Sequence, residues 1–206
     1  MTGRRAEARR RNREALITAA ERLFTAHGYR DVGVHAVAQA ADLTSGAIYS
    51  IFGSKLDLLL AVLDRRLDGL DAALAEVDGD RTTTATAVVA TYAEEFHRVV
   101  TSRDGRSALR LEVDVLAVVL RDEDGTADRL RLAVRREERL ASVLTGRTVA
   151  TDDDHRLTGD QASRLASAVC ALLRGLAQQQ ALTGGATTPD RWADLAAALI
   201  TPARRP

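Results

Sequence analysis

The sequence predicts an all-α protein, and three features of its composition indicate this class. Only three of the 206 residues are proline, at positions 189, 202 and 206, so no proline interrupts a helix before position 189. Alanine, leucine, arginine and glutamate, all good helix formers, dominate the chain. Alternating runs typical of strands are absent, because the nearest one, "VDVLAVVL" at 113–120, reads equally well as a buried helix. We therefore expect about nine helices.

The N-terminal quarter reads as three helices joined by short connections. The first lies within residues 10–32, with apolar side chains on one face and an end at Gly28. The second covers 34–41, and the third covers 45–52 with its apolar side chains pointing inward. A glycine breaks the third helix, and Ser54 can cap the next one by accepting a hydrogen bond from a free backbone N–H.

The remaining chain continues as helices with one clear boundary. A leucine-rich helix is expected over Lys55–Val77, and the polar stretch "DGDRTTT" at 78–84 breaks its period. Further helices are expected at about 83–102, 106–121, 126–145, 159–183 and 189–200. The helix at 106–121 is apolar almost all round, so we expect it to be central in its domain. The predicted domains are an N-terminal one over 1–55, a connecting helix over 56–77 and a C-terminal one over 78–206.

Charge is distributed unevenly, although the formal net charge is zero. Residues 1–55 carry nine basic and five acidic side chains, whereas the remainder carries 20 basic and 24 acidic ones. A basic N-terminal part followed by an acidic remainder indicates that the N-terminal part binds a polyanion. The single cysteine, Cys170, cannot form an internal disulfide. Because the N-terminus lacks a signal-peptide core and no run reaches the roughly 18 apolar residues of a membrane span, we expect a cytoplasmic protein without a membrane partner.

Two short helices joined by a tight turn, the second opening with small polar residues, are typical of a helix-turn-helix. In that interpretation the second helix enters the major groove, where hydroxyls bond to bases and a methyl group contacts thymine. A glycine in its first turn costs about 1 kcal/mol relative to alanine but lets the backbone approach DNA. The candidate contacts are Ser45, Gly46, Ala47 and Ser50 for bases, and Tyr49 and Lys55 for phosphates. The alternative is an ordinary helical hairpin with a solvated tyrosine, and composition alone does not separate the two.

The stretch "VGVHAVAQAADLTSGAIYSIFGSKLDLLLAVL" resembles the DNA-binding region of the TetR family of bacterial transcriptional regulators. The resemblance covers about residues 10–65, and the residues in register are Gly28, Tyr29, Ala38, Gly46, Tyr49, Phe52 and Lys55. It implies a homodimeric regulator, a repressor, that binds double-stranded DNA at a pseudo-palindromic operator. It also implies that a small-molecule effector binds the C-terminal domain and releases the DNA.

Several positions depart from the family's pattern. Gly33 stands where threonine or serine usually caps the second helix, so only backbone N–H groups can contact a phosphate there. Asp42 replaces a glycine of the turn, and aspartate tolerates the left-handed conformation. Ser45 replaces a common lysine, and Ile51 a common histidine or tyrosine, which weakens the expected contacts. His35 matches a position that contacts a base or phosphate in relatives, although it could equally be a solvated helix residue.

The arginine-rich stretch "RRAEARRRNR" at 4–13 has two interpretations. It could be a solvated tail, or it could reach phosphates or the minor groove, and such arms in the family are often mobile without DNA. We favour phosphate contact by Arg9, Arg10 and Arg11, because an arm could restore the affinity that the departures at positions 33 and 45 remove.

The C-terminal domain resembles the family only in architecture, so its site residues are inferred from their types. The candidate ligand pocket comprises Tyr92, Phe96, Arg110, Glu112 and Asp114. For the aromatic residues core packing is the favoured alternative, and for the charged ones it is internal pairing, because an ionised group on a buried helix needs a partner. The candidate dimer interface is a four-helix bundle formed by the last two helices across a two-fold axis. Its residues are Leu165, Val169, Leu172, Gly175, Leu176, Trp192, Leu195 and Leu199.

No residue pattern indicates an enzyme, a cofactor or a metal site. The run "DDDH" at 152–155 has no matching ligand cluster, "DEDGTAD" at 122–128 lacks EF-hand spacing, and the four histidines form no zinc pattern. A helical enzyme that kept the N-terminal fold therefore has no catalytic constellation to support it. The remaining alternative is a DNA-binding helical regulator that is controlled by a protein partner rather than by a small molecule.

Overall fold

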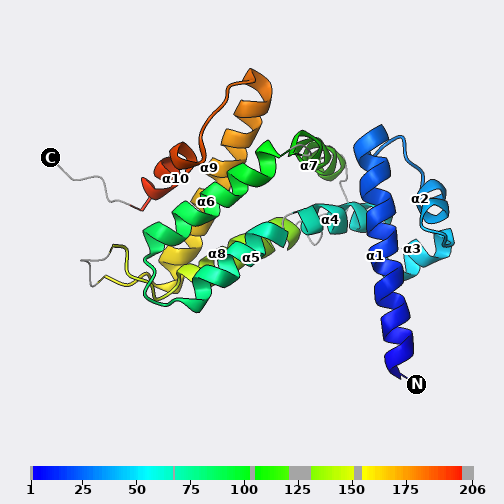
Figure 1. Ribbon diagram of the computed structural model, residues 1–206, viewed down its shortest axis with the longest axis horizontal. Helices are drawn as coiled ribbons and strands as arrows, with labels where there is room; N and C mark the ends of the chain where they lie inside the picture. Colours follow the sequence, from blue (N-terminus) through cyan, green and yellow to red (C-terminus); the bar gives the residue numbers. More distant parts are fainter. Residues whose placement is uncertain (1, 67, 103–104, 121–130, 151–154, 201–206) are drawn as a thin grey trace. The chain divides into compact units, whose positions relative to one another are not determined.

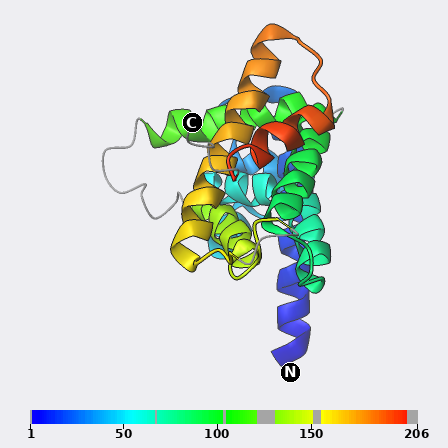
Figure 2. The ribbon, with the colours of Figure 1, turned by 90° about the vertical axis from the view of Figure 1, so that its left-hand side faces the viewer.

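The computed structural model describes residues 2–66, 68–102, 105–120, 131–150 and 155–200 (Figures 1 and 2). Within these residues the chain forms ten helices and no strand, which confirms the predicted all-α class. The helices group into two compact units, one of residues 1–66 with 107–129 and one of residues 67–106 with 130–206. The loop expected at 122–128, the aspartates of "DDDH" at 152–154 and residue 67 of the leucine-rich helix lie outside the described residues.

Unit 1 is formed by the N-terminal helices and most of one later helix. Its helices are α1 (Thr2–His27), α2 (Val34–Ala40), α3 (Ser45–Phe52), α4 (Lys55–Arg66) and α7 (Gly105–Val119) from residue 107 onward. α1 packs against α2, α3 and α4. Buried side chains from all four form the core: Leu16, Phe24, Val37, Ile48 and Leu59. Ser54 caps α4 as predicted, since the Asp57 N–H donates to Ser54 Oγ at 3.0 Å.

α1 begins at Thr2, whereas the apolar pattern predicted a first helix from about residue 10 with residues 4–13 as an arm. The apolar pattern did not reveal the first turns of α1, because residues 3–13 place no side chain in the core. Their alanines, arginines and glutamate nevertheless favour helix, and Glu7 pairs with Arg11 at 3.8 Å in the i, i+4 spacing. The first helix therefore begins about eight residues earlier than the apolar pattern predicted.

The leucine-rich helix expected over Lys55–Val77 is described as two helices, α4 and α5 (Asp68–Gly79), on either side of residue 67. The two helices belong to different units, and the division falls between Arg66 and residue 67. This division accounts for ten described helices where about nine were expected.

α7 is not the central helix that its apolar composition predicted. Leu111 is buried, but Val113 and Leu116 are 52% and 49% exposed. Arg110 is exposed and Asp114 is half-buried, so these charged residues do not lie in a closed core. The prediction failed because apolar composition shows only that a helix face can be buried by other elements. In this chain the face of α7 that carries Val113 and Leu116 is exposed.

Unit 2 is built around α6 (Ala85–Thr101). α6 packs against α5, α9 (Gly159–Thr183) and α10 (Pro189–Ala197), and α8 (Arg131–Leu144) packs on α9. Thr84 caps the start of α6, where its hydroxyl accepts from the Ala87 N–H at 3.2 Å. The boundaries at 84–85 and 158–159 thus lie where a threonine precedes and caps each helix.

The aromatic residues of unit 2 lie in its core. Trp192 is fully buried, its ring is stacked 6.2 Å from that of Phe96, and its Nε1–H donates to Thr187 Oγ1 at 2.7 Å. The Tyr92 hydroxyl lies 3.9 Å from Cys170 Sγ. Burial raises the pKa of both the Tyr92 phenol and the Cys170 thiol, so both remain protonated near neutral pH.

A buried arginine joins three segments of unit 2. Arg147, which follows α8, is 1% exposed. Its guanidinium donates to the backbone carbonyls of Val77 in α5, Asp80 after α5, Thr83 before α6 and Val143 in α8, at 2.7–2.9 Å. Arg147 thereby supplies donors to carbonyls near helix ends, where intrahelical partners are missing.

No single helix in the described part of the chain is both long and apolar enough to cross a membrane. α3 and α4 satisfy the length and hydropathy requirements only when they are counted together, and the chain bends by 70° between them. The leucines that make α4 apolar are buried in unit 1.

Candidate nucleic-acid interface

α2 and α3 are held together by a buried contact and a left-handed turn residue. Val37 and Ala38 of α2 and Ile48 of α3 are at most 1% exposed. Asp42 has a φ of 56°, the one positive value outside glycine among the described residues. The next N–H, from Leu43, donates to the Ala38 carbonyl at 2.8 Å and closes the turn. Asp42 therefore adopts the conformation that the sequence predicted for it.

The face of α3 that points away from Ile48 is exposed. Tyr49 is 55% exposed, which is a large fraction for an aromatic side chain. The residues predicted on α2 and α3 to contact DNA are all exposed or half-buried: His35, Ser45, Gly46, Ala47, Tyr49 and Ser50. The pair thus presents small and hydroxylated side chains to the outside, as an element that enters a groove requires.

Gly46 is not required by the packing of unit 1. A Cβ placed there would meet Thr44 Oγ1 at 3.7 Å, an ordinary contact. Glycine inside a helix is nevertheless less favourable than alanine by about 1 kcal/mol. The fold therefore gives no reason for a glycine at this position, and its absent side chain leaves room for a molecule that approaches α3 from outside.

Lys55 has a structural partner that sequence reasoning missed. Its Nζ donates to the Tyr29 carbonyl at 2.6 Å and lies 4.2 Å from the centre of the Tyr29 ring. Burial lowers the pKa of this ammonium, an effect that the carboxylates of Asp31 and Asp114 oppose. No local signal could have revealed the bond, because its partners lie 26 residues apart.

The arginines of the arm differ in their surroundings. Arg9 Nη2 donates to the Ser50 carbonyl of α3 at 3.1 Å. The Arg13 guanidinium lies 5.5 Å from the centre of the Phe52 ring, a contact that was not predicted. Arg11 pairs with Glu7 on the surface, and Arg10 is exposed. The predicted contacts Arg9, Arg10 and Arg11 therefore do not form one equivalent set.

α1 also holds the end of α4. The Glu21 carboxylate pairs with both Arg65 and Arg66, and the Arg66–Glu21 distance is 3.0 Å. Arg66 also donates to Thr25 Oγ1 at 2.7 Å. These contacts fix the last turn of α4, after which the chain passes into unit 2 at residue 67.

α7 contacts the loop that follows α1. The Tyr29 N–H donates to Asp114 Oδ2 at 3.4 Å. Arg110 Nη2 lies 2.9 Å from the position that a Cβ on Gly28 would occupy, and Gly28 has a φ of 85°. Of the predicted pocket residues, Arg110 and Asp114 therefore serve contacts within unit 1, and Glu112 is half-buried on the same helix.

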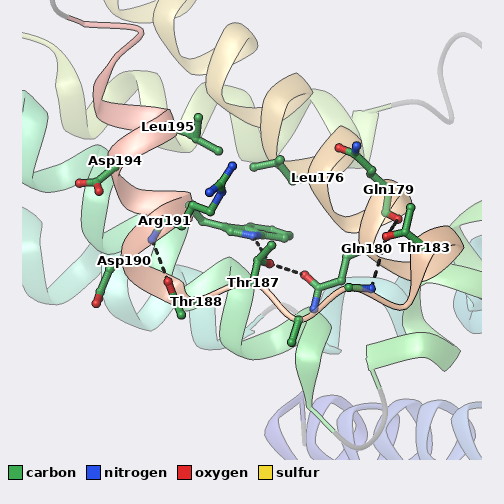
Figure 3. A pocket seen from close by; sticks show the side chains of 13 residues that line it. Leu176, Gln179, Gln180, Thr183, Thr187, Thr188, Asp190, Arg191, Asp194 and Leu195 are labelled. Carbon is green, nitrogen blue, oxygen red and sulfur yellow. Dashed lines mark hydrogen bonds between the residues drawn. The ribbon is translucent and has the colours of Figure 1, made fainter.

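The residues predicted to line a ligand pocket belong to two different units and have different surroundings. Tyr92 and Phe96 are 2% and 7% exposed and pack in the core of unit 2, whereas the charged residues lie on α7. A cavity of about 820 Å³ lies elsewhere, between the end of α9 and the start of α10. Figure 3 shows its polar lining, in which Thr187 donates to Gln180 Oε1 at 2.8 Å. Sequence reasoning missed it because glutamines and threonines near a loop carry no distinctive signal.

The predicted dimer residues separate into two groups. Val169 and Trp192 are fully buried in the core of unit 2, so they cannot contribute to a contact with a second chain, and we remove them from the interface. The others are exposed or half-buried on α9, α10 and the residues after α10: Leu165, Leu172, Gly175, Leu176, Leu195 and Leu199. On α9 the apolar spacing alone did not distinguish the face that packs in the core of unit 2 from the face that is exposed, so the prediction treated both as one stripe.

The fold and the exposed face of α3 define a helix-turn-helix protein with a helical second unit. Residues 16–62 match the family described as "Bacterial regulatory proteins, tetR family", so this region of the chain is similar to the members of that family. The match spans α1 from Leu16 onward, α2, α3 and most of α4. The resemblance to this family that the sequence showed is therefore confirmed over residues 16–62.

Two curated relatives match the same end of the chain. The HTH-type transcriptional repressor KstR of Mycolicibacterium smegmatis is 36% identical over 66 residues, 32% of each chain. The HTH-type transcriptional activator FasR of the same organism is 40% identical over 58 residues, 28% of this chain and 26% of that protein. The chain matches at most about a third of the length of these relatives.

Solved structures resemble the chain over nearly its whole length. The multidrug binding protein EbrR, complexed with imidazole, is 23% identical with a TM-score of 0.62 and covers 94% of this chain and 95% of its own. The regulator SCO7518 of Streptomyces coelicolor A3(2), whose function is assigned provisionally, is 21% identical with a TM-score of 0.63, covering 93% and 99%. At this identity the likeness establishes the fold alone.

Proposed function

We propose that this chain is a DNA-binding transcriptional regulator that acts as a homodimer on a pseudo-palindromic operator. The observation that carries the proposal is the exposed face of α3, which combines a sterically unneeded glycine with small hydroxylated side chains. Such a face suits a helix that enters the major groove. A single short helix contacts few bases, so two copies at half-sites about one helical turn apart are required.

Each exposed residue has a role in this proposal. Ser45 and Ser50 exchange hydrogen bonds with base edges, and Ala47 contacts a thymine methyl group. The Tyr49 hydroxyl donates to a phosphate oxygen, and His35 contacts a base or phosphate from α2. Lys55 reaches a phosphate only after its ammonium leaves the Tyr29 carbonyl, so that contact requires a change in the side chain.

Replacing Tyr49 with alanine should weaken binding to DNA of any sequence about tenfold, because each protomer loses one phosphate hydrogen bond. The thermal midpoint should not change, since more than half of this side chain is exposed. Fluorescence anisotropy with a labelled duplex measures the affinity, and circular dichroism measures the midpoint. An affinity equal to that of the wild type would remove Tyr49 from the interface.

We further propose that the protein is a repressor that releases DNA when a small molecule binds unit 2. Its relative KstR is named a repressor, whereas FasR is named an activator. The chain passes between the units at residues 66–67 and again in α7, where residues 105–106 belong to unit 2 and residue 107 begins the part in unit 1. α7 is suited to transmit a signal because Asp114 bonds to the Tyr29 N–H beside Lys55. An effector would act by binding the DNA-incompetent form more tightly.

The proposed dimer contact is the outer face of α9 together with α10. Leu195 and Leu199 are 38% and 45% exposed, which leaves apolar surface available in a single chain. Gly175 is exposed, and a Cβ there would meet no atom within 4 Å. A second copy would cover these residues and pack helix against helix, as in a four-helix bundle.

Replacing Gly175 with arginine should produce monomers, because the change places bulk and charge in the contact. The single chain has open space at this position, so unit 2 should keep its fold. Gly79→Arg is the matched control: it adds the same side chain at another open, exposed glycine and should stay dimeric. Sedimentation measures both variants, and a Gly175→Arg dimer at micromolar concentration would place the interface elsewhere.

A further inference from the structure

We infer that residues 2–13 of α1 form a rigid helical arm that contacts the DNA backbone through one face only, with Arg5 as its leading contact. The inference rests on the proposed function and extends its DNA-binding surface. It replaces a mobile arm, in which all arginines would be equivalent, with a helix in which two neighbouring arginines have different roles.

The arm is tied to the recognition helix by one ridge of α1. Arg9 and Arg13 are one turn apart, and both contact α3, through the Ser50 carbonyl and the Phe52 ring respectively. This ridge therefore faces the helix whose exposed side is proposed to enter the groove. α1 continues past Arg9 to Thr2, and Figure 1 shows this end extending beyond α3.

The helical repeat places Arg4 and Arg5, the first two arginines of the helix, on different sides. Arg5 lies four residues before Arg9 and so continues the ridge that faces α3. Arg4 lies seven residues before Arg11, and this places both on the opposite side, where Glu7 pairs with Arg11. Arg5 is exposed and makes no hydrogen bond or ion pair with the residues that the structure describes. The carboxylate of the arm thus lies away from the side that would meet phosphates.

The charge and length of the arm fit a phosphate strand. Residues 2–13 carry six arginines and one glutamate. The part before Arg9 is about 10 Å long at 1.5 Å per residue, which equals the rise of about three phosphates of one strand along the duplex axis, at about 3.4 Å each. A preformed helix avoids the backbone ordering of about 1–2 kcal/mol per residue that a mobile arm would require on binding. The surface pair between Glu7 and Arg11 is weak and does not alter this balance.

Arg5→Ala and Arg4→Ala test the inference, because they remove the same charge at adjacent positions that point about 100° apart around the helix axis, Arg5 toward the ridge that faces α3 and Arg4 away from it. The probe is a fluorescein-labelled 40-base-pair duplex of fixed sequence, titrated with each protein at several KCl concentrations. For Arg5→Ala we expect the slope of log K against log salt to fall by about 0.9 per protomer, or about 1.8 per dimer. For Arg4→Ala we expect less than half of that change. Equal changes in both variants, or none in Arg5→Ala, would overturn the inference.

A double variant, Ala6→Gly with Ala8→Gly, keeps every charge and weakens the helix of the arm by about 2 kcal/mol. We expect lower DNA affinity and a smaller difference between changes at positions 4 and 5 when they are made in this background. Affinity equal to that of the wild type would show that the arm acts as a flexible chain. Failure of the wild type to bind any duplex would instead reject the proposed function, so the two failures are distinguishable.

Discussion

Replacing Arg147 with methionine should lower the free energy of unfolding by about 3–5 kcal/mol, the range for the loss of one partner from a buried ionic contact. The guanidinium donates to four backbone carbonyls from α5, α8 and the connection before α6. Its Nη2 also lies 3.6 Å from Asp78 Oδ1. Methionine fills part of the volume but supplies no donor, so buried carbonyls lose their partners.

Urea unfolding followed by circular dichroism measures this effect, with Arg81→Met as the control. Arg81 pairs with the same Asp78, at 3.2 Å, but is exposed, so its loss should change the free energy of unfolding by less than about 1 kcal/mol. Arg147→Lys keeps the charge but cannot reach all four carbonyls, and it should fall between the two. An unchanged unfolding midpoint for Arg147→Met would contradict the role given to this residue.

Replacing Gly46 with alanine should have two effects of opposite sign. The free energy of unfolding should rise by up to about 1 kcal/mol, because alanine favours helix and its Cβ meets only Thr44 Oγ1 at an ordinary distance. DNA affinity should fall at least about tenfold, since the methyl group stands where the backbone of α3 must approach DNA.

The two effects of Gly46→Ala are measured on one preparation, by thermal unfolding and by fluorescence anisotropy. A variant that is more stable and binds DNA as well as the wild type would show that the glycine does not serve the interface. A variant that is less stable would show that α3 has a packing constraint that the neighbourhood of Gly46 does not reveal.

Local features of the DNA-binding end were predictable because their causes are local. The apolar spacing of α3, the Ser54 cap and the left-handed Asp42 each depend on residues within a few positions of one another. The structure agrees with the sequence at all three. The helical start of α1 was missed because helix propensity alone, without a core-facing stripe, was not counted as a signal.

Long-range contacts explain the other differences. Lys55 bonds to a carbonyl 26 residues away, and Arg147 bonds to one 70 residues away, so neither could be read from spacing. On α9 the sequence shows apolar residues at helical spacing, but it does not show which face meets the chain's own core. Val169 faces that core, whereas Gly175 faces outward.

The central claim is that the exposed face of α3 reads DNA sequence as part of a dimer. The most direct test selects bound duplexes from a random-sequence library with the purified protein and with a Ser45→Ala, Ser50→Ala variant. The account predicts that the wild type enriches a two-fold symmetric motif with half-sites about one helical turn apart, and that the variant loses preference at positions within each half-site. Absence of any enriched motif, or the same motif with both proteins, would contradict it.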